Sequence, residues 1–164
     1  FIVRSTCIAG LIACGNDSTS KFAPYSAICG YLYSQGLVTR GWTNYDPSDS
    51  SDWGCNSPYR ILDDGYPMSD NIAYYVEGDA DRVTKAYLVL NVNDMTLETN
   101  AKQILIKAAK ELTRKVTGSL LPSSMRTALT SAHSYKVQLG KFAISSTKEG
   151  YRSGKGYQLT YAIE

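Results

Sequence analysis

The sequence predicts an α+β fold: a four-stranded antiparallel sheet made of two hairpins, about three helices packed mainly on one face, and a long disulfide-tied loop. Three observations support this prediction. Three segments repeat apolar residues every three or four positions, as amphipathic helices do. Four segments alternate apolar and polar residues, as half-buried strands do. Residues 40–70 follow neither pattern and are rich in Gly, Pro, Asp, Asn and Ser, which is typical of a loop.

Three helices are expected. The first covers residues 21–35 and ends before Gly36, a residue type that favours the left-handed cap of a helix. The longest covers residues 96–117 and ends at Gly118, and a shorter one covers residues 122–132. The inward stripe of the longest helix is expected to hold Leu97, Ala101, Ile104, Ala108, Leu112 and Val116.

Four strands are expected in two pairs. Residues 71–77 and 83–92 flank a Gly-Asp-Ala-Asp turn and form the first hairpin. Residues 136–146 and 157–163 form the second, joined by a glycine-rich connection. Within each strand of the first hairpin, alternation places a tyrosine, Tyr75 or Tyr87, on the face opposite the more apolar positions.

The four cysteines allow three disulfide pairings. Cys29 and Cys55 are the expected pair, because they close a polar loop that has little apolar material of its own. A bridge closing a loop of this length contributes about 3–4 kcal/mol on the chain-entropy estimate. Cys7 and Cys14 form a second bridge if both are retained. Disulfides indicate an oxidising compartment and therefore export, whereas four reduced, buried thiols in a cytosolic protein are the alternative.

Residues 1–20 are expected to be separate from a single α+β domain over residues 21–164. A positive charge precedes a short apolar run, in the order of a secretory leader, and the run is shorter than the roughly 20 residues of a membrane span. Leu11-Ile12-Ala13-Cys14 resembles the bacterial lipobox, which implies a lipid at Cys14 as the only membrane contact. The alternatives are a core element of the domain, or an arm (residues 1–14) that joins a neighbouring subunit.

The loop over residues 40–70 is the expected binding region. Long loops inside compact domains are often functional. Aromatic residues interleaved with Asp and Asn suit a protein or glycan partner, whereas the alternative is that the rings pack the loop onto the sheet. The candidate binding residues are Trp42, Tyr45, Trp53, Tyr59 and Tyr66.

Charge is unevenly distributed along the chain. Residues 1–80 hold four Lys and Arg against nine acids, a net −5, and residues 81–164 hold thirteen against six, a net +7. Either the halves neutralise each other within one fold, or they form contact surfaces, including head-to-tail self-association. A basic strip on the longest helix is interpreted as a solvated face, and no nucleic-acid motif is present. The strip comprises Lys107, Lys110, Arg114 and Lys115.

The leading functional hypothesis is an exported, non-catalytic binding or accessory protein of the bacterial periplasm, outer envelope or extracellular space, with a bacterial envelope lipoprotein as its specific form. No catalytic motif is present, and His133 is the single histidine. We expect no cofactor and no metal. One alternative is a structural subunit joined through residues 1–14. The other is a hydrolase that uses Asp residues of the 40–70 loop. Asp46, Asp49 and Asp52 recur there every third residue beside serines, an oxygen-rich pattern that calcium favours, but the spacing differs from that of an EF-hand and a solvated loop is expected.

Overall fold

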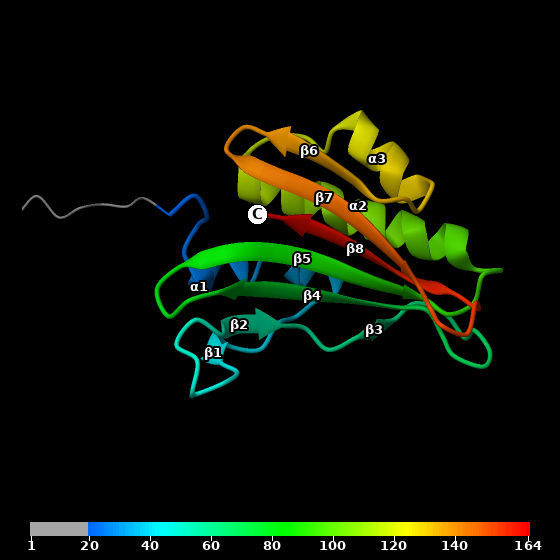
Figure 1. The fold of residues 1–164 in the computed structure, drawn as a ribbon, viewed down its shortest axis with the longest axis horizontal. Helices are drawn as coiled ribbons and strands as arrows, with labels where there is room; N and C mark the ends of the chain where they lie inside the picture. The colour runs from blue at the N-terminus through cyan, green and yellow to red at the C-terminus, as the bar shows by residue number, and fades with distance from the viewer. Residues whose placement is uncertain (1–19) are drawn as a thin grey trace, which may run out of the picture.

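The computed structural model describes residues 20–164 as one antiparallel sheet with helices on one side (Figure 1). The sheet has eight strands, and every paired neighbour is antiparallel. From one edge to the other the order is β1 (Thr43–Asn44), β2 (Trp53–Asn56), β4 (Asn71–Gly78), β5 (Val83–Val92), β8 (Tyr157–Ile163), β7 (Phe142–Gly150) and β6 (Tyr135–Leu139). Strand β3 (Arg60–Ile61) pairs with β4 on the same side as β2. The predicted α+β class with an antiparallel sheet is confirmed.

The predicted number of four strands is wrong, for two physical reasons. The stretch 40–70 is not wholly irregular, since it contributes β1, β2 and β3. These strands have only two to four residues, too few for an alternating pattern to be recognised. The expected strand 136–146 is a further hairpin, because Gly140 adopts a positive φ of 59° and reverses the chain between β6 and β7.

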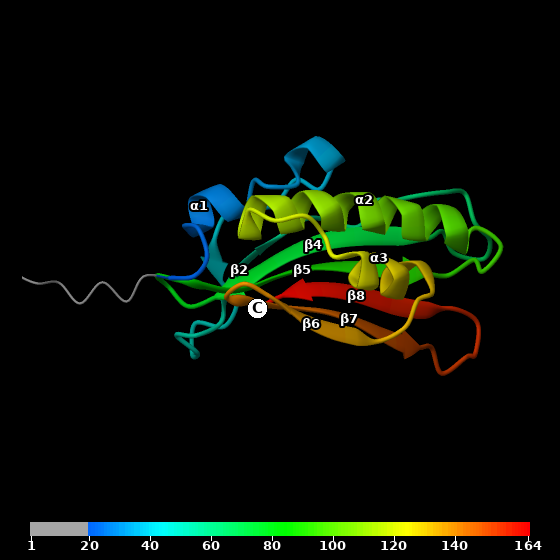
Figure 2. The same cartoon turned by 90° about the horizontal axis from the view of Figure 1, so that it is seen from above.

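The helices cover one face of the sheet and leave the other open (Figure 2). The elements are α1 (Tyr25–Ile28), the 3₁₀ turn η1 (Tyr33–Gln35), α2 (Glu98–Thr117) and α3 (Ser123–Thr130). The core lies between them and the inward side chains of the central strands. Fully buried members of this core include Tyr74, Leu88, Leu105, Met125 and Tyr161. No helix within residues 20–164 has the length and apolar character needed to cross a membrane.

Two helix predictions need correction. The expected helix over residues 21–35 is broken into α1 and η1, with turns between them around Gly30, a residue type that weakens helix interiors. In α2 the buried stripe includes Leu105, whereas Ile104 is only partly buried and Leu97 stands at the N-cap. The helix still ends at Gly118, which adopts the left-handed conformation that favours glycine.

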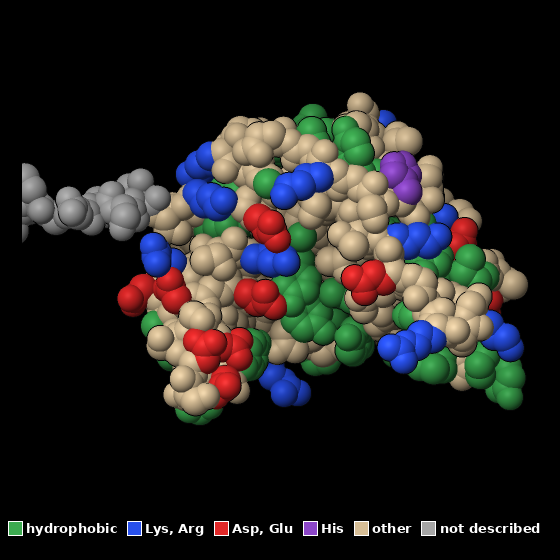
Figure 3. Space-filling view, in the orientation of Figure 1, with side chains coloured by type: hydrophobic (Ala, Val, Ile, Leu, Met, Phe, Trp, Pro, Cys, Tyr) green, Lys and Arg blue, Asp and Glu red, His purple; other side chains and the backbone are tan. Residues whose placement is uncertain are grey.

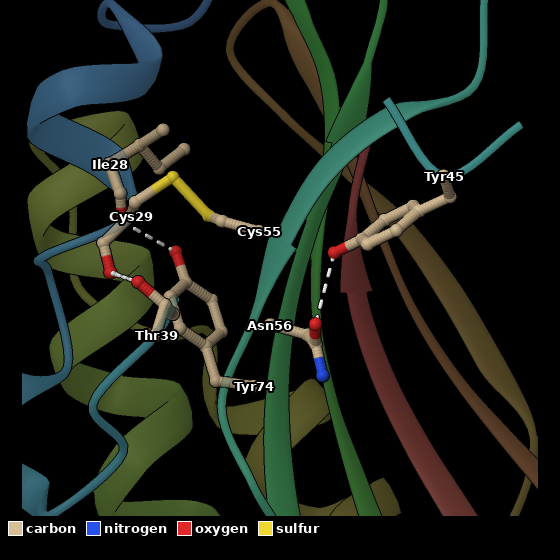
Figure 4. The surroundings of a disulfide bond; sticks show 7 residues. All are labelled: Ile28, Cys29, Thr39, Tyr45, Cys55, Asn56 and Tyr74. Atoms are coloured by element: carbon tan, nitrogen blue, oxygen red, sulfur yellow. Dashed lines mark hydrogen bonds between the residues drawn. A yellow bond between two sulfur atoms is a disulfide. The ribbon is translucent and has the colours of Figure 1, made fainter. Parts of the chain in front are cut away.

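The disulfide joins Cys29, just after α1, to Cys55 in β2, as the sequence predicted (Figure 4). Their Cα atoms are 6.2 Å apart. Two hydrogen bonds hold the same turn: the buried Tyr74 hydroxyl donates to the Ile28 carbonyl at 2.9 Å, and the Thr39 hydroxyl donates to the Cys29 carbonyl at 2.8 Å. The N-terminal segment is therefore attached to the sheet covalently and through hydrogen bonds. Cys7 and Cys14, with their predicted bridge and lipid, lie outside the described residues.

Candidate binding surface

The face of the sheet without helices carries a cluster of tyrosines. Strand alternation turns Cys55 toward the helices and Asn56 toward the open face, where Asn56 accepts a 3.0 Å hydrogen bond from the Tyr45 hydroxyl (Figure 4). Next to it, the rings of Tyr75 on β4 and Tyr87 on β5 stack at 5.0 Å and 10°. The Tyr75 hydroxyl lies 3.3 Å from that of Tyr59. We call Tyr45, Tyr59, Tyr75 and Tyr87 the tyrosine cluster.

The cluster covers small apolar residues and remains partly open to solvent. Ala73 and Val89 lie on the same face by alternation, yet they are only 0% and 7% exposed, so larger neighbours lie over them. Tyr59 is 51% exposed, and Ile61 in β3 is 60% exposed. Figure 3 shows hydrophobic side chains gathered over the middle of β4 and β5 on this face. The sheet therefore presents an aromatic surface where a solvated face usually carries polar residues.

The phenols of Tyr45, Tyr75 and Tyr87 remain neutral hydrogen-bonding groups. Burial raises the pKa of Tyr75 and Tyr87, and for Tyr87 a hydrogen bond to the Glu77 carboxylate and the charge of that carboxylate raise it further. Burial, with the nearby charges of Glu77 and Asp52, also raises the pKa of Tyr45. Because these three hydroxyls already donate within the protein, they offer a partner uncharged acceptor oxygens and ring edges.

A row of amides continues the surface toward β8. Asn91 on β5 donates to the Asn71 side chain at 2.9 Å. The side-chain oxygen of Asn91 accepts hydrogen bonds from Gln158 at 3.1 Å and from the Tyr151 hydroxyl at 3.2 Å. Because these groups satisfy one another, the row is held in a defined geometry before any partner binds.

The five predicted binding residues do not form one surface. Tyr45 and Tyr59 belong to the tyrosine cluster. Trp42 stacks on Tyr25 of α1, with ring centroids 5.2 Å apart, and packs against the core. Trp53 shares the helix-side face with Cys55 and is partly buried.

Tyr66 lies apart, at the end of the sheet where β5 and β8 meet the loops, and is 90% exposed. It lines an open cleft of about 570 Å³ together with Met68, Met95 and Tyr151, among other residues. Thus the structure brings two of the five candidates together and places the other three elsewhere.

Sequence reasoning missed Tyr75 and Tyr87 as site residues. The signal was present, since alternation places both tyrosines opposite the apolar positions of their strands. The turn between the strands aligns them as direct cross-strand partners. The sequence alone can therefore reveal a tyrosine pair at the solvent-facing positions of a hairpin. It cannot reveal that Tyr45 and Tyr59 lie beside that pair.

Two carboxylates of the 40–70 loop, those of Asp46 and Asp49, have structural partners. Asp46 accepts hydrogen bonds from the backbone and hydroxyl of Ser48, and Asp49 does the same with Ser51. These bonds lower the pKa of both fully exposed carboxyls, whereas an acid catalyst needs a raised pKa. Within residues 20–164, no group of three His, Cys, Asp or Glu side chains is placed to hold a metal ion.

Comparison with known proteins gives no assignment: no protein family, no curated protein and no solved structure matches the chain significantly. Functional inference therefore depends on the surfaces of the molecule itself.

Proposed function

We propose that the protein is an exported, non-catalytic binding protein whose open sheet face contacts a protein partner through the tyrosine cluster. The observation that carries the proposal is the half-exposed aromatic cluster on a sheet face without helical cover. Contiguous exposed apolar surface marks interaction sites, and tyrosine is enriched among the residues that dominate binding energy.

A protein partner fits this surface better than a sugar. Sugars stack on free aromatic faces, but one face of Tyr75 and one face of Tyr87 are stacked against each other, with ring centroids 5.0 Å apart. The cluster offers ring edges and hydroxyls, beside the exposed Ile61 and the pre-ordered amide row. Aromatic residues at the centre and polar groups around them are the usual anatomy of a protein interface.

Export is part of the proposal. The Cys29–Cys55 disulfide supports folding outside the reducing cytosol, in the bacterial periplasm, the outer envelope or the extracellular space. The lipobox-like sequence ending at Cys14 supports a lipid-anchored form. The intact mass of protein purified from its native source tests both ideas, because it reports leader cleavage, a lipid and the number of disulfides together. A mass that retains residues 1–13 without a lipid would contradict the lipoprotein form.

The binding surface is tested by placing a photo-crosslinking amino acid at position 59 in the native source. Position 33 is the matched control, since Tyr33 is 69% exposed and lies in η1 on the helix side. We expect one reproducible protein adduct from position 59 and none from position 33. With the purified adduct partner, Tyr59→Ala should weaken binding by about 30-fold or more, as for a typical hot spot, and Tyr33→Ala should not.

Three results would contradict this function. Equal adducts from both positions, or an affinity unchanged by Tyr59→Ala, would show that the open face is not the contact surface. Specific binding to a glycan array that is lost in Tyr59→Ala, without any protein adduct, would replace the protein partner with a carbohydrate.

A further inference from the structure

Direct ion pairs between the two oppositely charged halves are scarce within the described part of the fold. Four ion pairs are present there, and three of them join residues within 81–164: Lys85–Glu164, Lys102–Glu98 and Lys115–Glu111. The fourth, Arg82–Asp79, spans only the β4–β5 turn. Among residues 20–164, Arg82–Asp79 is therefore the one ion pair that joins the two halves.

Four cations without an ion pair meet in an open groove on the helix side of the molecule. The groove has a volume of about 640 Å³ and lies along α2 and the segment leading into α3. Its lining includes four exposed cations, Lys107, Lys110, Arg114 and Arg126. None of these has a carboxylate within ion-pair distance among residues 20–164.

The groove also has one acid and an apolar part. Glu111, the acid in the lining, is already paired with Lys115 at 2.7 Å, so it offers little neutralisation to the other cations. Leu120 in the same groove is 80% exposed. The groove therefore suits an acidic segment that carries a small apolar residue.

The same chain carries such a segment in the β1–β2 loop. Asp46, Asp49 and Asp52 are exposed there and form no ion pair in the described structure. Figure 1 shows this loop projecting beyond the sheet edge, and Figure 3 shows acidic side chains gathered on it. Hydrogen bonds to Ser48 and Ser51 give the loop a defined shape. Pro47, also exposed, is its apolar residue.

We propose that the acidic β1–β2 loop of one molecule docks into the basic groove of a second copy. The two surfaces are complementary in charge, with three carboxylates facing four cations. The cations from Lys107 to Arg114 are spread over about 10 Å of helix. Because the loop and the groove are different surfaces, each docked molecule keeps one of them free. The contact is therefore heterologous, and repeated head to tail it gives rings or open chains of molecules.

The test is the weight-average mass of the full chain by light scattering and sedimentation, over a range of concentrations at low and high salt. We expect masses beyond the dimer at low salt that fall toward the monomer at high salt, because exposed charges are screened. The groove variant Lys110→Glu with Arg126→Glu should weaken association by about 100-fold, since like charges would then face each other. Lys136→Glu with Lys141→Glu is the matched control: it makes the same change in net charge at exposed positions outside the groove and should retain association.

A mixing experiment makes the test specific. The loop variant carries three substitutions, Asp46→Asn, Asp49→Asn and Asp52→Lys. It keeps side-chain oxygens at positions 46 and 49 that can accept the turn hydrogen bonds, and it reverses the charge of the loop. Alone, this variant should be monomeric. Mixed with the groove variant, it should restore assembly, because each reversed surface then meets a complementary one. The proposal is overturned if the wild type stays monomeric at high concentration and low salt. It is equally overturned if both variants associate as the wild type does, or if the mixture stays monomeric.

Discussion

Removal of the Cys29–Cys55 disulfide should destabilise the protein by about 3.5 kcal/mol. The bridge closes a loop with a sequence separation of 26. For a loop of that size, the chain-entropy relation gives about 12 cal/mol/K, or about 3.5 kcal/mol at 25 °C. With a urea dependence of about 2 kcal/mol/M, the midpoint of unfolding should fall by about 2 M. The double variant Cys29→Ala with Cys55→Ala avoids placing a hydroxyl at the buried Cys55 position.

The native structure should survive this change. Tyr74 and Thr39 still bind the backbone carbonyls of Ile28 and Cys29, so α1 remains attached to the sheet. The loss therefore arises mainly from the larger freedom of the unfolded chain. We expect an unchanged native circular dichroism spectrum together with an increased urea dependence, because the unfolded chain without the bridge is less compact.

The assay is urea denaturation followed by tryptophan fluorescence and by circular dichroism. Wild-type protein reduced with dithiothreitol is the control, because it breaks the bridge and keeps both sulfur atoms. It should match the double variant within about 1 kcal/mol. A loss below about 1 kcal/mol in both samples would refute the argument that the unfolded loop is free without the bridge.

Three further predictions concern buried polar and backbone groups. Tyr74→Phe should cost about 1–3 kcal/mol, measured by urea denaturation, because it leaves the buried Ile28 carbonyl without its donor; an unchanged midpoint would show that this hydrogen bond is dispensable. Gly78→Ala should cost about 1–3 kcal/mol, because its Cβ would lie 1.9 Å from a backbone carbonyl oxygen across the turn. Gly41→Ala, whose Cβ meets nothing within 4 Å, should change thermal stability little, and similar losses in both variants would contradict the steric argument. Burial raises the pKa of Asp70 in the folded state above its unfolded value of about 4. The contribution of Asp70 to stability is therefore complete below the unfolded pKa and is lost as pH rises through the folded pKa. Wild-type protein should therefore lose stability relative to Asp70→Asn over that interval, and a difference independent of pH, by urea titration at several pH values, would refute it.

Local patterns in the sequence predicted the elements whose signals are long and self-contained. Helix α2 has five turns of apolar periodicity and a terminal glycine. Strands β4 and β5 have eight and ten residues and a turn of suitable composition between them. The Cys29–Cys55 pairing also followed from the sequence, because the polar loop between these residues needs a covalent tie. In each case the decisive interactions lie within the segment or join the ends of one loop.

Short strands and helix breaks depended on their surroundings. Strands β1 and β3 have two residues each, and they are strands only because an edge of the sheet offers hydrogen-bond partners. The expected helix over residues 21–35 contains Gly30 and is attached to the sheet by Cys29 and by the Tyr74 hydroxyl. Tertiary attachment therefore outweighed a local periodicity that favoured one continuous helix.

Both candidate surfaces combine features that are readable in short stretches of sequence with contacts between distant segments. The sequence determined the facing of Tyr75 and Tyr87 and the existence of acidic and basic segments, because alternation and charge are properties of neighbouring residues. The tertiary structure decided that Tyr45 and Tyr59 join those two rings, and that Arg126 of α3 completes a groove with the cations of α2. These contacts join residues far apart in the chain, and their geometry is set by strand order and helix packing, which no local pattern encodes.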